Sequence, residues 1–152
     1  DFLQMRRYES YKDSGVEWLG EVPSHWDVKK LKYLAKLSPS KAEIICNHEE
    51  LCSFIPMEKL KLNTLVLDEI KQIKSVYSAY TYFRNEDLLI AKVTPCFENK
   101  NFAIAKNLVN SIGFGSSEIY VLRAYNNLFN KFLFYIYVLF STTAKLQLKS
   151  EL

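Results

Sequence analysis

Residues 92–101 bring together side chains whose chemistry suits both parts of a nucleic-acid duplex. Lys92 and Lys100 carry ammonium groups, which bind backbone phosphates without reading sequence. Hydroxyl and amide side chains can hydrogen-bond to the edges of bases, and here they belong to Thr94, Asn99 and Asn101. Because both kinds of group occur in one short segment, the pattern indicates a DNA-reading loop.

A second candidate loop, residues 112–117, has a glycine on either side of Phe114. Glycine tolerates positive φ and lets the backbone approach another group closely. We expect this segment to form a turn from which Ser116 and Ser117 add hydroxyl or backbone N–H contacts to phosphate. Second-tier candidates lie earlier in the chain: Lys71, Lys74 and Arg84 for phosphate, and Tyr80 for bases.

The two loops are expected to connect strands. Residues 88–91, 102–105 and 118–123 are short apolar runs bounded by polar residues, which is typical of buried strands. Pro95 lacks a backbone donor, which argues against a central strand in the first loop. Loops held between rigid strands are a common location for binding residues.

Other stretches predict the remaining elements. Residues 52–57 favour a strand ending at Pro56, and residues 65–67 favour another short strand. Residues 77–84 alternate aromatic and hydroxyl side chains, a composition typical of strands that also suits stacking on bases. The spacing of three apolar residues predicts one shared face: Ile70, Ile73 and Val76.

Residues 128–140 carry apolar side chains at helical steps after an asparagine pair that can cap a helix. We expect this helix to pack on the sheet. The predicted fold class is therefore α+β, with a mixed or antiparallel twisted sheet, a C-terminal packing helix and long loops.

These stretches also carry a family resemblance. Residues 91–99 are similar to a run written GDVLxAKITPCxENGK, and residues 113–123 to a run written GIGFGSTEFxVLR, in the target recognition domain of type I restriction–modification specificity subunits. Residues 11–26, 53–58 and 80–83 resemble three further pieces of that family, in the same order.

The resemblance implies a domain order. Residues 1–7 are expected to be an N-terminal tail whose first four residues are a remnant of expression, and residues 8–141 the DNA target recognition domain. Residues 142–152 are expected to lead towards a long connector helix that this chain lacks. The chain is then a fragment of a two-domain subunit or a half-length subunit.

The resemblance also implies a function without catalysis. The domain is expected to read one half of a bipartite target in double-stranded DNA. A modification subunit binding S-adenosylmethionine is expected to methylate adenine, and a restriction subunit using ATP and Mg²⁺ to cleave DNA. No cofactor is expected in this chain.

The sequence departs from the family pattern where glycines are expected. The residues found instead are Ala79, Glu86, Lys100 and Ser111. If their backbones need positive φ, each costs about 1 kcal/mol or more relative to glycine.

Two catalytic or metal-binding alternatives follow from residue order. Asp87 followed by Glu98 and Lys100 resembles a Mg²⁺-dependent nuclease signature, although Glu98 and Lys100 fall in a loop. A zinc site is disfavoured because its four candidate ligands lack paired spacing: Cys46, His48, Cys52 and Cys96. A general nucleic-acid-binding module remains a further alternative.

The composition places only broad bounds on function. The chain has 152 residues, a net charge of +3 and 49% hydrophobic residues, so one globular domain is expected. The mild positive charge permits nucleic-acid binding without requiring it. No secretory signal is visible, and the longest apolar run is shorter than the roughly 20 residues that span a bilayer, so a cytoplasmic protein without membrane contact is expected.

Overall fold

The computed structural model describes residues 8–17, 19–92, 101–126 and 131, and divides the chain into two compact units, Asp1–Leu31 and Lys32–Leu152. The first unit is a hairpin of β1 (Tyr11–Asp13) and β2 (Glu21–Pro23), paired antiparallel. The predicted boundaries of the recognition domain, 8–141, stay a prediction.

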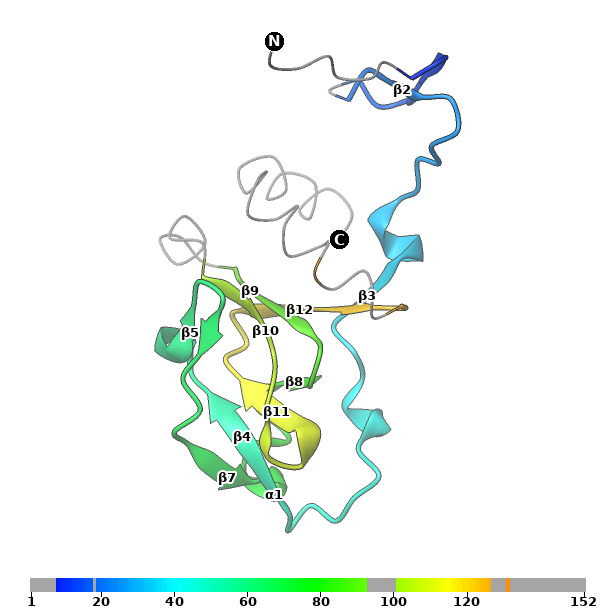
Figure 1. Ribbon diagram of the computed structural model, residues 1–152. Helices are drawn as coiled ribbons and strands as arrows, with labels where there is room; N and C mark the ends of the chain where they lie inside the picture. The colour runs from blue at the N-terminus through cyan, green and yellow to red at the C-terminus, as the bar shows by residue number, and fades with distance from the viewer. Residues whose placement is uncertain (1–7, 18, 93–100, 127–130, 132–152) are drawn as a thin grey trace. The chain divides into compact units, whose positions relative to one another are not determined.

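The larger unit contains two four-stranded sheets (Figure 1). The first has the order β10-β9-β12-β3 and is antiparallel throughout. Its strands are β3 (Ala35–Leu37), β9 (Leu88–Ala91), β10 (Phe102–Ile104) and β12 (Ile119–Ala124).

The second sheet has the order β7-β4-β11-β8 and is mixed, because β11 runs parallel to β4 and antiparallel to β8. Its strands are β4 (Leu51–Ile55), β7 (Ile70–Gln72), β8 (Thr81–Arg84) and β11 (Ile112–Gly115). A small hairpin pairs β5 (Leu60–Lys61) with β6 (Thr64–Leu65).

Helices are few among the described residues. The α-helix α1 (Ile73–Val76) is a single turn, and four 3-10 turns are η1 (Leu31–Tyr33), η2 (Lys41–Glu43), η3 (Met57–Lys59) and η4 (Val109–Ser111). The predicted packing helix, 128–140, lies outside the described residues except for Lys131. In the described part of the chain, no helix has both the length and the apolar character needed to cross a membrane.

Side-chain alternation along the strands divides the core in two. Ile55 and Phe83 face the first sheet, where they are buried with Leu89 and Val121. The neighbouring positions on β4 and β8 face the other way, into a second cluster closed by α1: Cys52, Phe54, Ile73, Val76, Tyr82 and Phe114. Strands β4 and β8 therefore contribute to two apolar layers, which explains why residues 52–55 and 82–83 are all buried. The edge strand β7 belongs to neither cluster and is largely exposed.

The glycine segment differs from the sequence-based expectation. Residues 112–115 form a central strand rather than a turn, and neither Gly113 nor Gly115 has a positive φ. Instead, a Cβ at Gly113 would lie 2.2 Å from Cε2 of Phe83, and one at Gly115 would lie 2.7 Å from the carbonyl oxygen of Ile55. Gly113 is therefore required because the Phe83 ring lies against the strand, and Gly115 because the backbone of Ile55 does.

The other strand expectations hold in part, since residues 77–84 are strand only from Thr81 and residues 65–67 only at Leu65. Residues 88–91 form β9 as predicted, and β4 ends at Ile55, just before Pro56. The prediction of a shared apolar face is wrong for Ile70, which is 55% exposed in β7, whereas Ile73 and Val76 are buried in α1. The chain turns from strand to helix at Gln72, so the three residues do not share one helical face.

Two of the four missing glycines fall at strained positions. Glu86 has φ 73° and Ser111 has φ 60°, both in the left-handed region that glycine prefers. Ala79 is not among the residues with positive φ, and Lys100 lies outside the described residues. The expected backbone cost therefore applies at Glu86 and Ser111.

Candidate nucleic-acid interface

Lys92 lies beside Ser117 and Glu118, which follow β11. The Lys92 N–H donates to the Glu118 carbonyl at 2.9 Å, and Lys92 Nζ donates to the Ser117 carbonyl at 2.7 Å. The Ala91 N–H donates to the Asn101 carbonyl at 3.0 Å, so Asn101 lies beside the end of β9. Antiparallel pairing thus brings Lys92, Asn101 and Ser117 to one end of the first sheet.

The described residues hold the Lys92 side chain without using all of its donors. Its ammonium lies 4.6 Å from the centre of the Tyr120 ring, in a cation–π arrangement, and donates to one carbonyl. An ammonium has three N–H donors, so donors remain for a phosphate oxygen. Tyr120 was not predicted as part of the site. It lies two positions after Glu118, and alternate residues of an extended segment point to the same side, which is the signal that could have identified it.

Ser116 and Ser117 occupy the short connection between β11 and β12. The Ser116 hydroxyl oxygen accepts the Glu118 N–H at 3.1 Å, which fixes the turn, and Ser117 is exposed. The turn keeps the two serines next to Lys92. Glu118 is also exposed here, so the surface is not uniformly positive.

The hairpin of β5 and β6 joins the same end, which the sequence analysis did not predict. The N–H of Asn63, at its tip, donates to the carbonyl of Phe102 at 2.9 Å. Phe102 pairs with Ile90, next to the end of β9. We call the following set the loop end of the first sheet: Asn63, Lys92, Asn101, Ser116 and Ser117.

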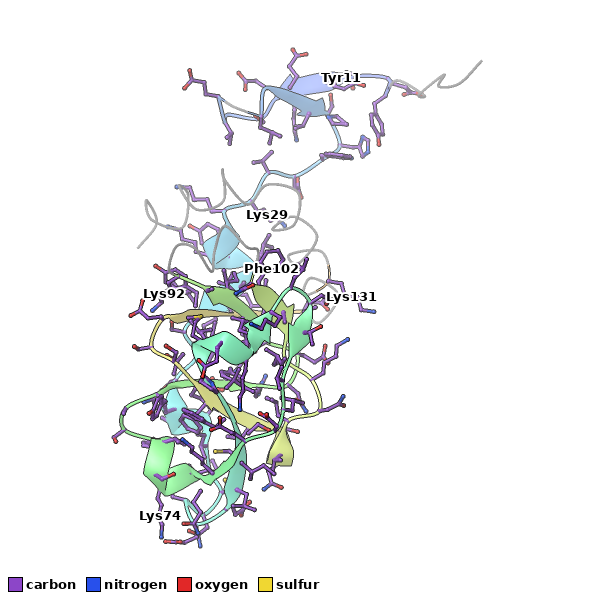
Figure 2. The ribbon with its side chains drawn as sticks, turned by 90° about the vertical axis from the view of Figure 1, so that its left-hand side faces the viewer. Tyr11, Lys29, Lys74, Lys92, Phe102 and Lys131 are labelled. Atoms are coloured by element: carbon purple, nitrogen blue, oxygen red, sulfur yellow. The ribbon has the colours of Figure 1, made fainter. Side chains whose placement is uncertain are left out.

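Three second-tier candidates lie elsewhere in the unit. Lys74 donates to both carboxylate oxygens of Glu49 at 2.9 and 2.7 Å. Lys71 Nζ lies 3.7 Å from the centre of the Phe54 ring, and Tyr80 packs edge-on against the same ring at 4.8 Å. Figure 2 shows Lys74 and Lys92 at opposite ends of the unit, so Lys74 does not extend the loop end. Lys71 and Tyr80 both contact Phe54, which belongs to the second cluster.

Arg84 is exposed at the end of β8 that pairs with Ile112, where β11 begins. Ser116 follows the other end of β11, so Arg84 is also separate from the loop end. Thr94, Asn99 and Lys100 lie outside the described residues, and their predicted roles remain predictions.

The structure gives Asp87 a different role from the one in the nuclease alternative. Asp87 is 1% exposed, and its two carboxylate oxygens accept Nε and Nη2 of Arg123, each at 2.7 Å. The Arg84 N–H also donates to it, at 2.9 Å. This carboxylate is paired and buried at the start of β9, while Lys92 follows the other end of that strand. Glu98 and Lys100 lie outside the described residues.

The same guanidinium reaches a third element. Nη1 of Arg123 donates to Glu43 in η2. Burial alone would raise the pKa of Glu43, but the hydrogen bond and charge of Arg123 outweigh it and lower that pKa. Burial likewise opposes the charge on Arg123, yet Asp87 and Glu43 raise its pKa above its usual value. The network ties β12 to η2 and to the turn before β9.

The zinc candidates have structural surroundings where they are described. Burial raises the pKa of the Cys52 thiol to about 11, and its Sγ donates to the Lys71 carbonyl at 3.3 Å. The His48 ring lies 4.5 Å from the Tyr77 ring. Cys96 lies outside the described residues. These contacts are those of packed side chains.

Comparison with known proteins identifies relatives. The chain is 39% identical over 113 residues to the type I restriction enzyme EcoAI specificity subunit of Escherichia coli, covering 73% of this chain and 19% of that protein. It is 35% identical over 105 residues to the EcoEI specificity subunit of the same species, covering 68% of this chain and 17% of that protein. The chain thus spans about a fifth of the length of these relatives. No protein-family model matches the sequence. The family predicted from the motifs is confirmed, and this chain is a homologue of type I restriction enzyme specificity subunits.

Proposed function

We propose that this chain is a target recognition domain that binds double-stranded DNA sequence-specifically and reads one half of a bipartite target. The observation that carries the proposal is the contact of Lys92 with Ser117, which places a cation beside a serine turn in a homologue of specificity subunits. Cations and hydroxyl groups at the end of a rigid sheet suit the phosphates of a duplex.

The proposed roles divide between phosphate and base contacts. Lys92 binds phosphate with its remaining N–H donors, and Ser116 and Ser117 add hydroxyl or backbone contacts. Asn101 presents an amide to a base edge. Within residues 92–101, Lys100 would bind phosphate, and Thr94 and Asn99 would read base edges. Candidates for contacts outside this loop are Lys71, Lys74, Arg84 and Tyr80.

We further propose that the domain has no catalytic activity and works within a complex. A modification subunit would bind S-adenosylmethionine and methylate adenine where this domain directs it. A restriction subunit would use ATP and Mg²⁺ to cleave DNA. The engagement of Asp87 by Arg123 supports this division, because a Mg²⁺ nuclease needs that carboxylate free to bind the metal.

The test is selection of bound duplexes from a pool of random DNA sequences at low salt, where non-specific phosphate contacts are strongest. We expect the 152-residue chain to enrich one short motif, and unlabelled duplex carrying that motif to compete better than single-stranded RNA. Enrichment without a motif, or stronger competition by RNA, would show a general nucleic-acid binder instead.

A further inference from the structure

The tip of the β5–β6 hairpin presents a group of exposed side chains at the loop end. Lys61, Asn63 and Thr64 are exposed, and Leu62 between them is 49% exposed. Leu62 belongs to neither core cluster. The same tip offers an amide, a hydroxyl and an ammonium to a partner.

The hairpin is held in place from below. Leu60 is fully buried, and Leu65 packs on the same core cluster. The N–H of Val66 donates to the Lys59 carbonyl at 3.0 Å, and Lys59 Nζ donates to Glu69 at 2.5 Å. A tip supported this way can hold side chains in a defined direction, which base reading requires.

The position of the tip follows from its contact with β10. The Asn63 N–H donates to the Phe102 carbonyl at 2.9 Å, and Asn101 precedes that residue. Lys92 and Asn101 both lie at the end of β9. The hairpin tip therefore lies next to them and extends the same surface. Figure 1 shows β5 close to β9 and β10.

We propose that the β5–β6 tip is a second base-reading element, in which Asn63 reads an A·T base pair. This inference rests on the proposed function and deepens it. An asparagine amide can pair with the N6 and N7 groups of adenine in the major groove. Leu62 contacts the thymine methyl group, and Lys61 binds a flanking phosphate.

Asn63 can be changed without disturbing the backbone. Its φ of 55° lies in the left-handed region, where glycine is at least as stable as asparagine. Asn63→Gly therefore removes the amide and leaves the turn intact. Asn63→Asp keeps the shape but replaces the donor with an acceptor, which suits the N4 amino group of cytosine.

A matched control exists at the other end of the same sheet. Asn107 is exposed with φ 57°, and it follows Ala105, which exchanges backbone hydrogen bonds with Glu86 and Asp87 before β9. Asn107→Gly makes the same chemical change at the same backbone conformation. It lies away from the loop end.

The experiment repeats the selection from random duplexes with each variant of the full chain. We expect Asn63→Gly to lose about tenfold in preference for adenine at one position of the motif while other positions are kept. Asn63→Asp should shift that position towards cytosine. Asn107→Gly should enrich the same motif as the unmodified chain.

The outcomes separate the two proposals. If the unmodified chain enriches a motif and both Asn63 variants enrich that same motif, the hairpin is not a reading element, and the proposed function stands. If the unmodified chain enriches no motif, both proposals fail. The assignment would also be overturned if Asn107→Gly lost as much preference for adenine as Asn63→Gly, because the effect would then not depend on the hairpin tip.

Discussion

Gly113 shows how one residue can be constrained by packing rather than by a turn. Its missing Cβ leaves the space that the Phe83 ring fills, since the nearest ring carbon would lie 2.2 Å from an added Cβ. We expect Gly113→Ala to lower the free energy of unfolding by about 2 kcal/mol or more, because a ring in a close-packed core must move. Denaturant unfolding monitored by circular dichroism measures the change.

A second substitution tests the cause. Phe83→Leu removes the ring and should itself destabilise the fold, but Gly113→Ala should then cost less than it does alone. If the losses of unfolding free energy from the two substitutions simply add in the double variant, the clash lies elsewhere.

Glu86 carries a backbone cost that glycine would relieve. With φ 73°, it lies where L-residues cost about 1–2 kcal/mol and glycine does not. We expect Glu86→Gly to be more stable than Glu86→Ala by about 1 kcal/mol, because both remove the side chain and only glycine relieves the backbone. Equal thermal midpoints for the two variants would contradict a strained turn.

At the scale of elements, Arg123 joins three segments that are far apart in sequence. Removing its guanidinium leaves Asp87 buried at 1% exposure and without its charged partner. We expect Arg123→Met to cost about 3–5 kcal/mol of unfolding free energy. Adding Asp87→Asn should recover part of this loss, since the amide oxygen can still accept the Arg84 N–H; no recovery would argue against the buried charge as the cause.

Glu43 gives the network a pH dependence. Its pKa is lowered in the folded state by Arg123, so its contribution to stability is present above its ordinary pKa and is lost as pH falls. We expect the stability difference between the unmodified chain and Glu43→Gln to shrink between about pH 6 and pH 3. A difference that stays constant across that range would show that the ion pair adds nothing.

The elements that sequence patterns predicted best are those with continuous apolar runs. Residues 88–91 are buried on both faces of their sheet, so their strand is visible from composition alone. The strand at 112–115 was not predicted because Gly113 and Gly115 suggest a turn. Tertiary neighbours explain these glycines: the Phe83 ring beside Gly113 and the Ile55 carbonyl beside Gly115. Pairing between β4 and β11 is parallel and distant in sequence, which no local pattern reveals.

At the scale of the whole molecule, the candidate site was only partly predictable. The motifs pointed to Lys92 and to the serines at 116 and 117, and the fold brings these together through antiparallel pairing. The hairpin tip at Asn63 was missed because it carries no motif, and because its place at the loop end follows from a tertiary hydrogen bond to Phe102 in β10. Sequence patterns identify chemical groups more readily than they identify which groups share a surface.

The central claim is that a duplex binds at the loop end. The most direct test is the salt dependence of duplex binding by Lys92→Met, which keeps the aliphatic stem on Tyr120, compared with Lys106→Met. Lys106 is exposed at the opposite end of β10, next to Asn107. We predict that Lys92→Met binds more weakly and that its slope of log affinity against log salt is smaller by about 0.9, as expected for one lost phosphate contact, while Lys106→Met matches the unmodified chain. Equal affinity and slope for all three proteins would contradict the account.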